Sequence, residues 1–167
     1  GVDPQRFGSL SDSVTNITYT HNLWINNQSR TPKAKGRIQY VNNVVYNWSV
    51  CGLVGGHSAA DHALDAIGNY FIAGPNSNLH AVGEFKATDH VFQKDNFSDL
   101  NKDGKLDGKP VVAADFGGGE DAPTFASDLT VGPLKNVTVE PALTAFSKGF
   151  AQAGWSLHRD AVDDRLI

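Results

Sequence analysis

The sequence predicts an all-β fold, a parallel β-solenoid in which short strands stack coil upon coil. The main observation is a repeated phrase in which asparagine precedes aromatic or branched apolar residues, at steps of 21, 26 and 27 residues: Asn22 (HNLWI), Asn43 (NNVVYNW), Asn69 (GNYFIAG) and Asn96 (DNFSD). Recurrence at such a period is typical of stacked repeats. Because asparagine tolerates the left-handed backbone region, we expect it to turn the same corner in every coil, with the stacked amides bonded as a ladder.

The composition is compatible with one folded domain. The chain has 167 residues, of which 40% are hydrophobic and 10% aromatic, which suffices to bury a core. No run of eighteen apolar residues occurs, so we expect no membrane partner. Cys51 is the single cysteine, which excludes a disulfide within the chain. Since methionine is absent and the chain opens at Gly1, we expect a processed product or a fragment.

The first strands follow from β-branched and aromatic residues. Residues 14–25 and 37–48 are rich in these types and predict strands. The polar residues 26–35 between them include Pro32, which cannot donate a ladder hydrogen bond, and predict an exposed loop. Residues 52–62 contain three glycines and predict a loop or a bulged corner.

The later coils combine short strands with longer polar segments. Residues 63–73 are predicted as a strand because their asparagine phrase matches the neighbouring phrases. Two more strands are expected around residues 81–85 and 90–92. Residues 95–109 predict a polar loop, and the glycine-rich residues 117–122 predict a linker.

One amphipathic helix is predicted near the end of the chain. Leu143, Phe146 and Phe150 have helical spacing, Pro141 suits the first helical position, and Gly154 lies just beyond the last turn. We expect this helix and the tail to pack on the coils as a cap. The chain is therefore one domain, with coils and loops over residues 13–116 and linker, helix and tail over 117–167.

The solenoid is predicted to be partial. About three or four coils are visible, close to the minimum for a stable stack. The coil at residues 14–25 has no cap on its upstream face, and an open solenoid end is an aggregation edge. We therefore expect further N-terminal coils, either missing or carried by another chain.

Charge is distributed unevenly along the chain. The net charge is −4, yet residues 13–60 contain no aspartate or glutamate and include a basic cluster of Arg30, Lys33, Lys35 and Arg37. Such a stretch would attract a polyanion, either a nucleic acid or an acidic polysaccharide. The alternative is a solvated basic loop without a ligand.

Five short words resemble the pectate lyase family in consecutive order. They are residues 20–24 (THNLW), 29–32 (SRTP), 41–48 (VNNVVYNW), 68–71 (GNYF) and 159–163 (RDAVD). The resemblance implies the C-terminal part of a right-handed parallel β-helix that cleaves pectate by calcium-assisted β-elimination. It also implies a secreted protein whose partner is polygalacturonate or pectin, and no nucleic-acid partner.

The resemblance assigns the catalytic base to Arg30, in the family's R-x-P word. In elimination a base removes the proton next to the uronate carboxylate while the glycosidic oxygen departs, and calcium stabilises the developing charge. Arginine ordinarily has a pKa above 12, so the site must favour its neutral form or an unusually close approach.

The predicted substrate-binding residues are Lys33, Lys35, Arg37 and His21. Lys35 occupies the position at which the family has a second arginine, and lysine cannot form a bidentate fork with a carboxylate. The grip on the carboxylate is therefore weaker than in the family, or it shifts to Arg37.

A second departure concerns the catalytic metal. The family's principal calcium carboxylates and its substrate-binding lysine come from coils upstream of the H-N-L word, where this chain has only Asp3 and Asp12. The chain should then be inactive alone, or active as one half of a complex with a separate N-terminal half.

A separate calcium loop is predicted at Asp99, Asn101, Asp103 and Asp107, which match the opening of an EF-hand-type loop. Pro110 replaces the bidentate glutamate at the twelfth position, so the loop is either a weak structural calcium site or a glycine-containing turn. The cluster of His57, Asp61 and His62 has no convincing ligand spacing, and we favour satisfied loop histidines there.

Two other functions compete with a lyase. The first is a non-catalytic β-helix that binds acidic polysaccharide through the basic cluster. The second is hydrolysis, which needs two carboxylates flanking the bond; the acid-free stretch around Arg30 argues against it.

Overall fold

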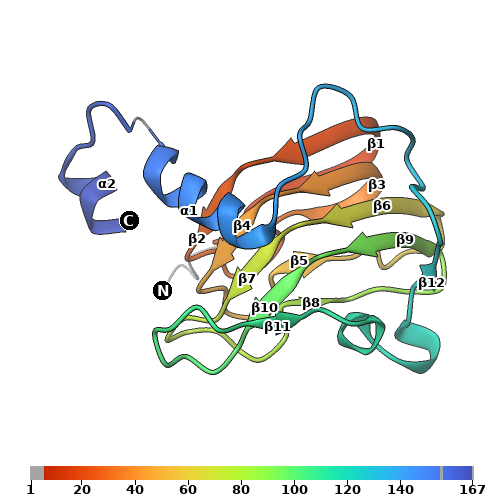
Figure 1. Cartoon of the computed structure of the whole chain (residues 1–167). Coiled ribbons are helices and arrows are strands. Elements are labelled where there is room, and N and C mark those ends of the chain that lie inside the picture. Colours follow the sequence, from red (N-terminus) through yellow and green to blue (C-terminus); the bar gives the residue numbers. More distant parts are fainter. Residues whose placement is uncertain (1–5, 155, 167) are drawn as a thin grey trace.

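The computed structural model describes residues 6–154 and 156–166, which form a mostly β fold with two sheets and two helices (Figure 1). The first sheet runs in the order β12-β9-β6-β3-β5-β8, with β1 also paired to β3. Its strands are β1 Leu10–Thr20, β3 Lys33–Val41, β5 Leu53–Val54, β6 His62–Ile67, β8 Val82–Gly83, β9 Asp89–Lys94 and β12 Thr124–Phe125. All pairs in this sheet are parallel.

The second sheet runs in the order β11-β10-β7-β4-β2. Its strands are β2 Leu23–Ile25, β4 Val44–Tyr46, β7 Tyr70–Ile72, β10 Phe97–Asp99 and β11 Lys109–Pro110. β11 pairs antiparallel with β10, and the other pairs are parallel. Two 3₁₀ turns, Ala113–Phe116 and Gly119–Asp121, precede the helices α1 Ala142–Gln152 and α2 Ala161–Leu166. Neither helix in the described part of the chain has the length and apolar character needed to cross a membrane.

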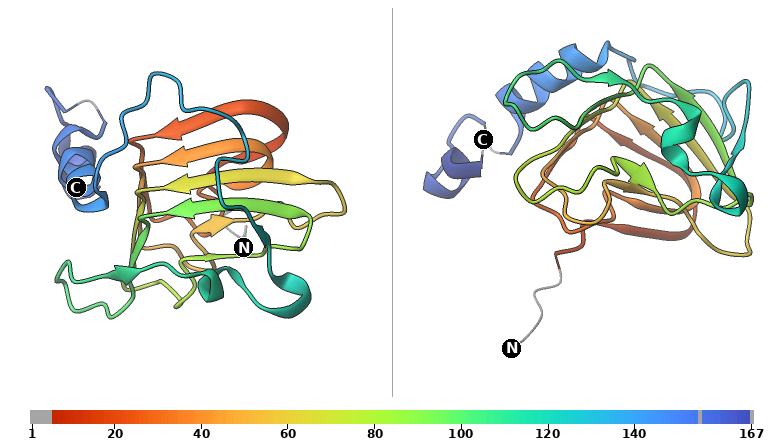
Figure 2. Two further views of the ribbon diagram at one scale, coloured as in Figure 1. Left: turned by 45° about the vertical axis from the view of Figure 1, so that its right-hand side comes forward. Right: turned by 90° about the horizontal axis from the view of Figure 1, so that it is seen from below.

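Equivalent residues of successive coils lie in register. Ile38 of β3 pairs with Leu64 of β6, which pairs with Val91 of β9, and all three side chains are buried. Figure 2 shows the strands lying one above another and curling around this interior. The apolar side chains of each coil thus bury those of the next, which stabilises the stack. The predicted stacking of parallel coils is confirmed.

The asparagine ladder is confirmed. The Nδ2 atom of each asparagine donates to Oδ1 of the next, over 2.9 Å from Asn22 to Asn43, 3.2 Å from Asn43 to Asn69 and 2.8 Å from Asn69 to Asn96. A backbone N–H also donates to each accepting oxygen. The ladder therefore satisfies buried backbone groups at every corner.

The prediction that these asparagines adopt the left-handed conformation is wrong. The positive φ belongs to the residue before each one, at His21, Asn42, Gly68 and Asp95, with φ between 54° and 63°. The turn at the preceding residue leaves the ladder asparagine free to point its amide along the stack, where it bonds to the next coil. Asparagine is tolerated both at the turn and in the ladder, so residue type alone could not show which of the two adjacent residues adopts the left-handed conformation.

The predicted exposed loop at residues 26–35 is also wrong. Ser29, Thr31 and Pro32 are buried, and β3 already begins at Lys33. Residues 7–9 pair with this segment on one side, where Gly8 N–H donates to the Ser29 carbonyl over 3.0 Å. Neighbouring coils thus bury a polar sequence that would be exposed if it stood alone.

Two other predicted loops contain short strands with buried residues. Residues 52–62 include β5, whose side chains are buried. Residues 95–109 include β10, which places Asp99 in the interior. Short strands of two or three residues do not show the alternation on which strand prediction depends.

A C-terminal strap (residues 126–140) crosses the first sheet from β9 past β6 and β3, as the blue segment of Figure 1 shows. Asp65 on β6 accepts hydrogen bonds from Thr130 N–H, Thr130 Oγ1 and Val131 N–H over 2.6, 2.7 and 3.2 Å. Asn42 exchanges two hydrogen bonds with the backbone of Glu140 over 2.7 and 2.8 Å. These contacts fix the strap and thereby the start of α1.

Helix α1 packs on β4 and β7, as expected of the predicted helix. Its buried side chains are Ala142 and Ala145, and the ring of Phe146 meets that of Tyr70 edge to face at 6.0 Å. The prediction that Leu143 belongs to the apolar face is wrong, because Leu143 is 55% exposed. The small residues allow the helix to approach the sheet closely.

Candidate functional site

Arg30 lies at a left-handed corner immediately before β3, with φ of 64°. Its guanidinium carbon is 4.1 Å from the centroid of the Phe7 ring, a cation–π contact. The Thr31–Pro32 peptide bond that follows is cis. Among the described residues, the Arg30 side chain has no hydrogen-bond or ion-pair partner. Its donors are therefore available to a ligand.

Lys33 and Lys35 lie two residues apart on β3, so their side chains leave the strand on the same side. The Lys33 ammonium is 3.5 Å from Oε2 of Glu84, and the Lys35 ammonium donates to Oδ2 of Asp12 over 3.0 Å. The Lys35 ammonium lowers the pKa of the Asp12 carboxyl. The surroundings of the basic cluster are thus not acid-free as predicted, because the fold brings in Asp12 and Glu84 from other coils.

Arg37 and His21 contact the C-terminal strap. Arg37 donates from Nη2 to the Thr130 carbonyl, and Nε2 of His21 is 3.4 Å from Oε2 of Glu140. The hydrogen bond from Lys148 lowers the pKa of Glu140, with His21 as a smaller cause. His21 lies beside Asn42 at the far end of β3 from Arg30. The strap therefore contacts Arg37 and His21, and His21 lies at the opposite end of β3 from Lys33.

A cavity of about 400 Å³ lies further along the stack, and Arg30 is not among its lining residues. Thr31 N–H donates to the Gly52 carbonyl, and Gly52 N–H donates to the His80 carbonyl. These backbone hydrogen bonds connect the residue after Arg30, coil by coil, to His80 in the cavity wall. Its lining includes the ionisable side chains of Cys51, His57, His80, Glu84, Asp115 and Asp121. Burial raises the pKa of Cys51 to about 12, which excludes this thiol as a nucleophile at neutral pH.

The four predicted ligands of the calcium loop differ in burial, and some of their side chains form hydrogen bonds within the loop. Asn101 Nδ2 donates to Oδ1 of Asp107 over 3.0 Å, and Oδ1 of Asp103 accepts a hydrogen bond from Lys105 N–H over 2.9 Å. Asp99 is buried in β10, whereas the other three predicted ligands are exposed. Within residues 6–154 and 156–166, no three His, Cys, Asp or Glu side chains are grouped so that they could hold a metal ion.

The histidine cluster agrees only in part with the interpretation as satisfied loop histidines, because His62 begins strand β6 and does not lie in a loop. His62 is buried, and its Nε2 is 2.7 Å from Oγ of Ser58. Asp61 is 3.5 Å from Nε2 of His90. His62 and Asp61 therefore have separate partners.

Comparison with known proteins identifies similar chains. No protein-family model matches, but three curated relatives are each named probable pectate lyase C. The relative from Aspergillus fumigatus is 35% identical over 170 residues, that from Emericella nidulans 34% over 168 and that from Aspergillus flavus 33% over 176. Every alignment covers the whole of this chain. The chain is therefore related to the pectate lyase family.

The chain spans 38–39% of the length of these relatives. The activity of a whole pectate lyase is consequently a proposal for this chain. The residues that sequence reasoning missed are Phe7, Asp12 and Glu84, each in contact with a residue of the basic cluster. Glu84 is 51 positions from Lys33, and no local signal in the sequence pairs them. Phe7 has a weak signal, since an aromatic residue near an arginine-containing coil is a candidate ring partner.

Proposed function

We propose that the chain forms part of a polysaccharide lyase that cleaves polygalacturonate by β-elimination, with Arg30 as the base. The observation that carries the proposal is which of the four basic side chains already have polar partners within the protein. Lys33 and Lys35 are paired with carboxylates and Arg37 with a carbonyl, whereas the guanidinium of Arg30 contacts only the Phe7 ring among the described residues. The relatedness to pectate lyases supports the same assignment.

The proposed step is balanced within the substrate. Arg30 takes the proton from the carbon next to the uronate carboxylate. The electron pair of that C–H bond forms a carbon–carbon double bond, and the bond to the glycosidic oxygen breaks. The departing oxygen takes a proton from water and Arg30 returns its proton to the solvent, which leaves one saturated chain end and one unsaturated end. The ring of Phe7 offers only its π face to the guanidinium, so it does not compete for the guanidinium hydrogen bonds.

Lys33 and Lys35 are proposed to attract the uronate carboxylates. Each ammonium would exchange its protein carboxylate, Glu84 or Asp12, for that of the substrate. Both lysines are partly exposed, so such an exchange costs little. Asp12 and Glu84 are unsuitable as the acid and base of a hydrolase, because each is ion-paired and the pKa of Asp12 is lowered.

Calcium would supply charge neutralisation at the uronate carboxylate during elimination. The residues described here do not form a three-ligand site for it, so we assign it no ligands beside Arg30. A separate chain that carries upstream coils would be the source of such ligands. We propose in addition that the coils wind in a right-handed sense and that the protein is secreted, because its polymeric substrate cannot enter a cell unaided.

The loop at residues 99–107 is proposed as a separate, weak calcium site. Side-chain oxygens of Asn101, Asp103 and Asp107 are exposed and lie in one EF-hand-type sequence word, and loops of low ligand count bind calcium with Kd of about 10⁻⁴–10⁻³ M. Calcium titration by calorimetry should show such binding, and Asp103→Ala should abolish it. Asp95→Ala, outside the word, is the matched control. Equal binding by both variants would refute the loop as the site.

The lyase proposal is tested by ultraviolet absorbance of unsaturated ends when the chain, together with the upstream coils proposed to supply the calcium ligands, is mixed with polygalacturonate, with calcium and then with chelator. Absorbance should rise with wild type and with Arg165→Ala, an exposed arginine of α2, and should not rise with Arg30→Ala. Polymer binding without products would favour the alternative, a non-catalytic module for acidic polysaccharide. Absence of both products and binding would refute both proposals.

A further inference from the structure

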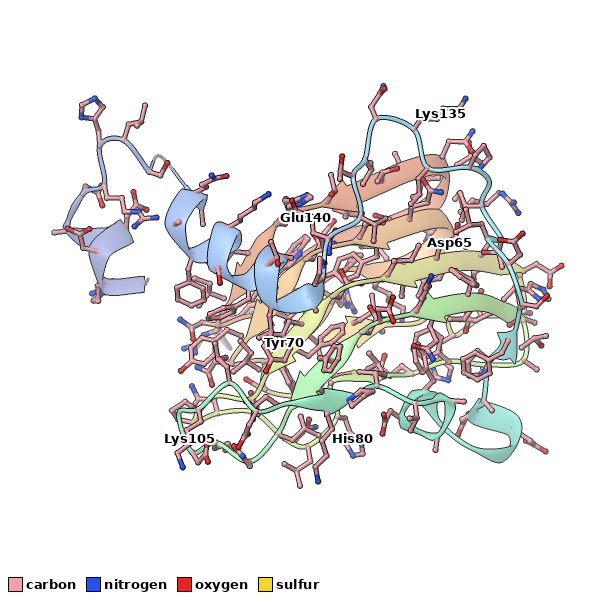
Figure 3. The ribbon with its side chains drawn as sticks, viewed as in Figure 1. Asp65, Tyr70, His80, Lys105, Lys135 and Glu140 are labelled. Carbon is pink, nitrogen blue, oxygen red and sulfur yellow. The ribbon has the colours of Figure 1, made fainter. Side chains whose placement is uncertain are left out.

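A second cavity, of about 630 Å³, lies between α1, the second sheet and the loop after β10. Tyr46, Ile72 and Asp99 are the last residues of β4, β7 and β10 and stack at one level, which forms the floor. Phe146 and Phe150 of α1 line one side, and Lys102 and Lys105 of the loop line the other. Figure 3 shows Lys105 on the loop that projects on the same side of the stack as α1. The volume suits a small ligand.

Asp99 is the most informative residue of this cavity. It is only 4% exposed, and its Oδ2 atom is buried without a hydrogen-bond partner in the described part of the chain. An unpaired buried carboxylate is costly and native proteins rarely leave one without a donor. A ligand with hydroxyl groups would supply that donor.

The aromatic wall indicates the shape of the ligand. The rings of Phe146 and Phe150 are 4.6 Å apart between centroids and tilted by 43°, and both are only half-buried. Tyr46 adds a third half-buried ring at the end of β4. Exposed rings beside a few polar groups are typical of small-molecule sites, and the apolar C–H face of a sugar ring packs on such a surface.

The two lysines indicate the charge of the ligand. Lys102 donates to the Ser77 carbonyl and retains further donors, whereas the Lys105 ammonium has no partner among the described residues. Both flank the cavity opposite the aromatic rings. A ligand that carries a carboxylate would neutralise them.

We propose that this cavity binds a hexuronate unit of an acidic polysaccharide. The ring face packs on Phe146 and Phe150, a hydroxyl donates to Asp99, and the carboxylate lies between Lys102 and Lys105. The inference rests on the proposed function for the choice of polymer, but it concerns a different sheet from Arg30. A polysaccharide bound at the cavity has a higher local concentration at Arg30. The cavity would therefore hold the polysaccharide while Arg30 acts on it.

The test is a titration of the full chain with trigalacturonate at pH 8 without calcium, followed by amide NMR shifts. Resonances of residues 100–108 and α1 should shift, and Lys105→Ala and Phe150→Leu should each weaken binding there about tenfold. Arg30→Ala should leave this binding unchanged. Neutral galactotriose should bind at least tenfold more weakly than trigalacturonate.

The outcomes separate this proposal from the lyase proposal. Binding that is lost in Arg30→Ala, without shifts around the cavity, would overturn the inference and leave the lyase proposal standing. Binding confined to the cavity, without products, would support the inference and count against the lyase site. Equal affinity for galactotriose would overturn the uronate assignment. If Asp99→Asn removes calcium binding but not trigalacturonate binding, Asp99 serves the calcium loop and its assignment to the sugar is wrong.

Discussion

Asn96 Oδ1 accepts two hydrogen bonds from Asn69, one from the backbone N–H over 3.0 Å and one from Nδ2 over 2.8 Å. Nδ2 of Asn69 also donates to the Tyr40 carbonyl over 2.8 Å, and its Oδ1 accepts from Asn43. One side chain therefore joins three coils at a position with no access to water.

Asn69→Ala is expected to destabilise the fold by about 2–4 kcal/mol, because buried partners on both sides lose their hydrogen bonds at about 1–3 kcal/mol each. Asn22→Ala, at the exposed end of the ladder, should cost less than about 1 kcal/mol. Urea unfolding of the two variants measures the difference. Equal losses would mean that the interior ladder contributes no more than its exposed end.

Gly68→Ala is expected to lower the free energy of unfolding by about 2–4 kcal/mol. Gly68 has φ of 63°, and a Cβ there would lie 2.5 Å from Nδ2 of Asn42 and 2.9 Å from the Glu140 carbonyl. The left-handed conformation alone costs an alanine about 1–2 kcal/mol, and displacement of Asn42 adds to it. Asp95→Gly, at the equivalent corner of the next coil, should change stability by no more than about 1 kcal/mol. Thermal unfolding tests both, and an unaffected Gly68→Ala would contradict the close approach.

Asp65→Asn is expected to release the C-terminal strap. The carboxylate has no exposed surface and accepts from three donors of Thr130 and Val131, while an amide can accept through one oxygen only. We expect a loss of about 2–4 kcal/mol and faster proteolytic cleavage within residues 126–140. Asp61→Asn, whose side chain is 82% exposed, is the control and should behave as wild type. Unchanged cleavage of the strap in Asp65→Asn would refute this role.

Because Cys51 is buried, we expect the free energy of unfolding to fall at alkaline pH. The folded pKa is about 12 and the ordinary value 9.0, so the contribution is fully present below pH 9 and is lost as pH rises, because only the unfolded thiol ionises. Between pH 9 and 10 the free energy of unfolding should fall by up to about 1.4 kcal/mol more in wild type than in Cys51→Ala. Urea unfolding under reducing conditions at pH 8, 9 and 10 measures this. Parallel pH profiles would show that the thiol does not contribute.

Parts of the candidate site were predictable from the sequence. The R-x-P word singled out Arg30, and the family resemblance drew attention to Lys33 and Lys35 in the basic cluster beside it. The ion pairs of these lysines were not predictable, because Asp12 and Glu84 reach them only when coils stack. The same limit applies to residues 26–35, whose polar composition conceals burial between neighbouring coils.

The sequence by itself determined the repeat, its register and the ladder, because every coil needs the same residue at the same corner and repeats it at a readable period. Only the tertiary structure decided which residue adopts the left-handed turn, which helix face is buried and which carboxylates meet the basic cluster. These features depend on contacts between coils, such as those that join residues 23 and 51 positions apart. Contacts of that kind arise from packing in three dimensions, and no local propensity encodes them.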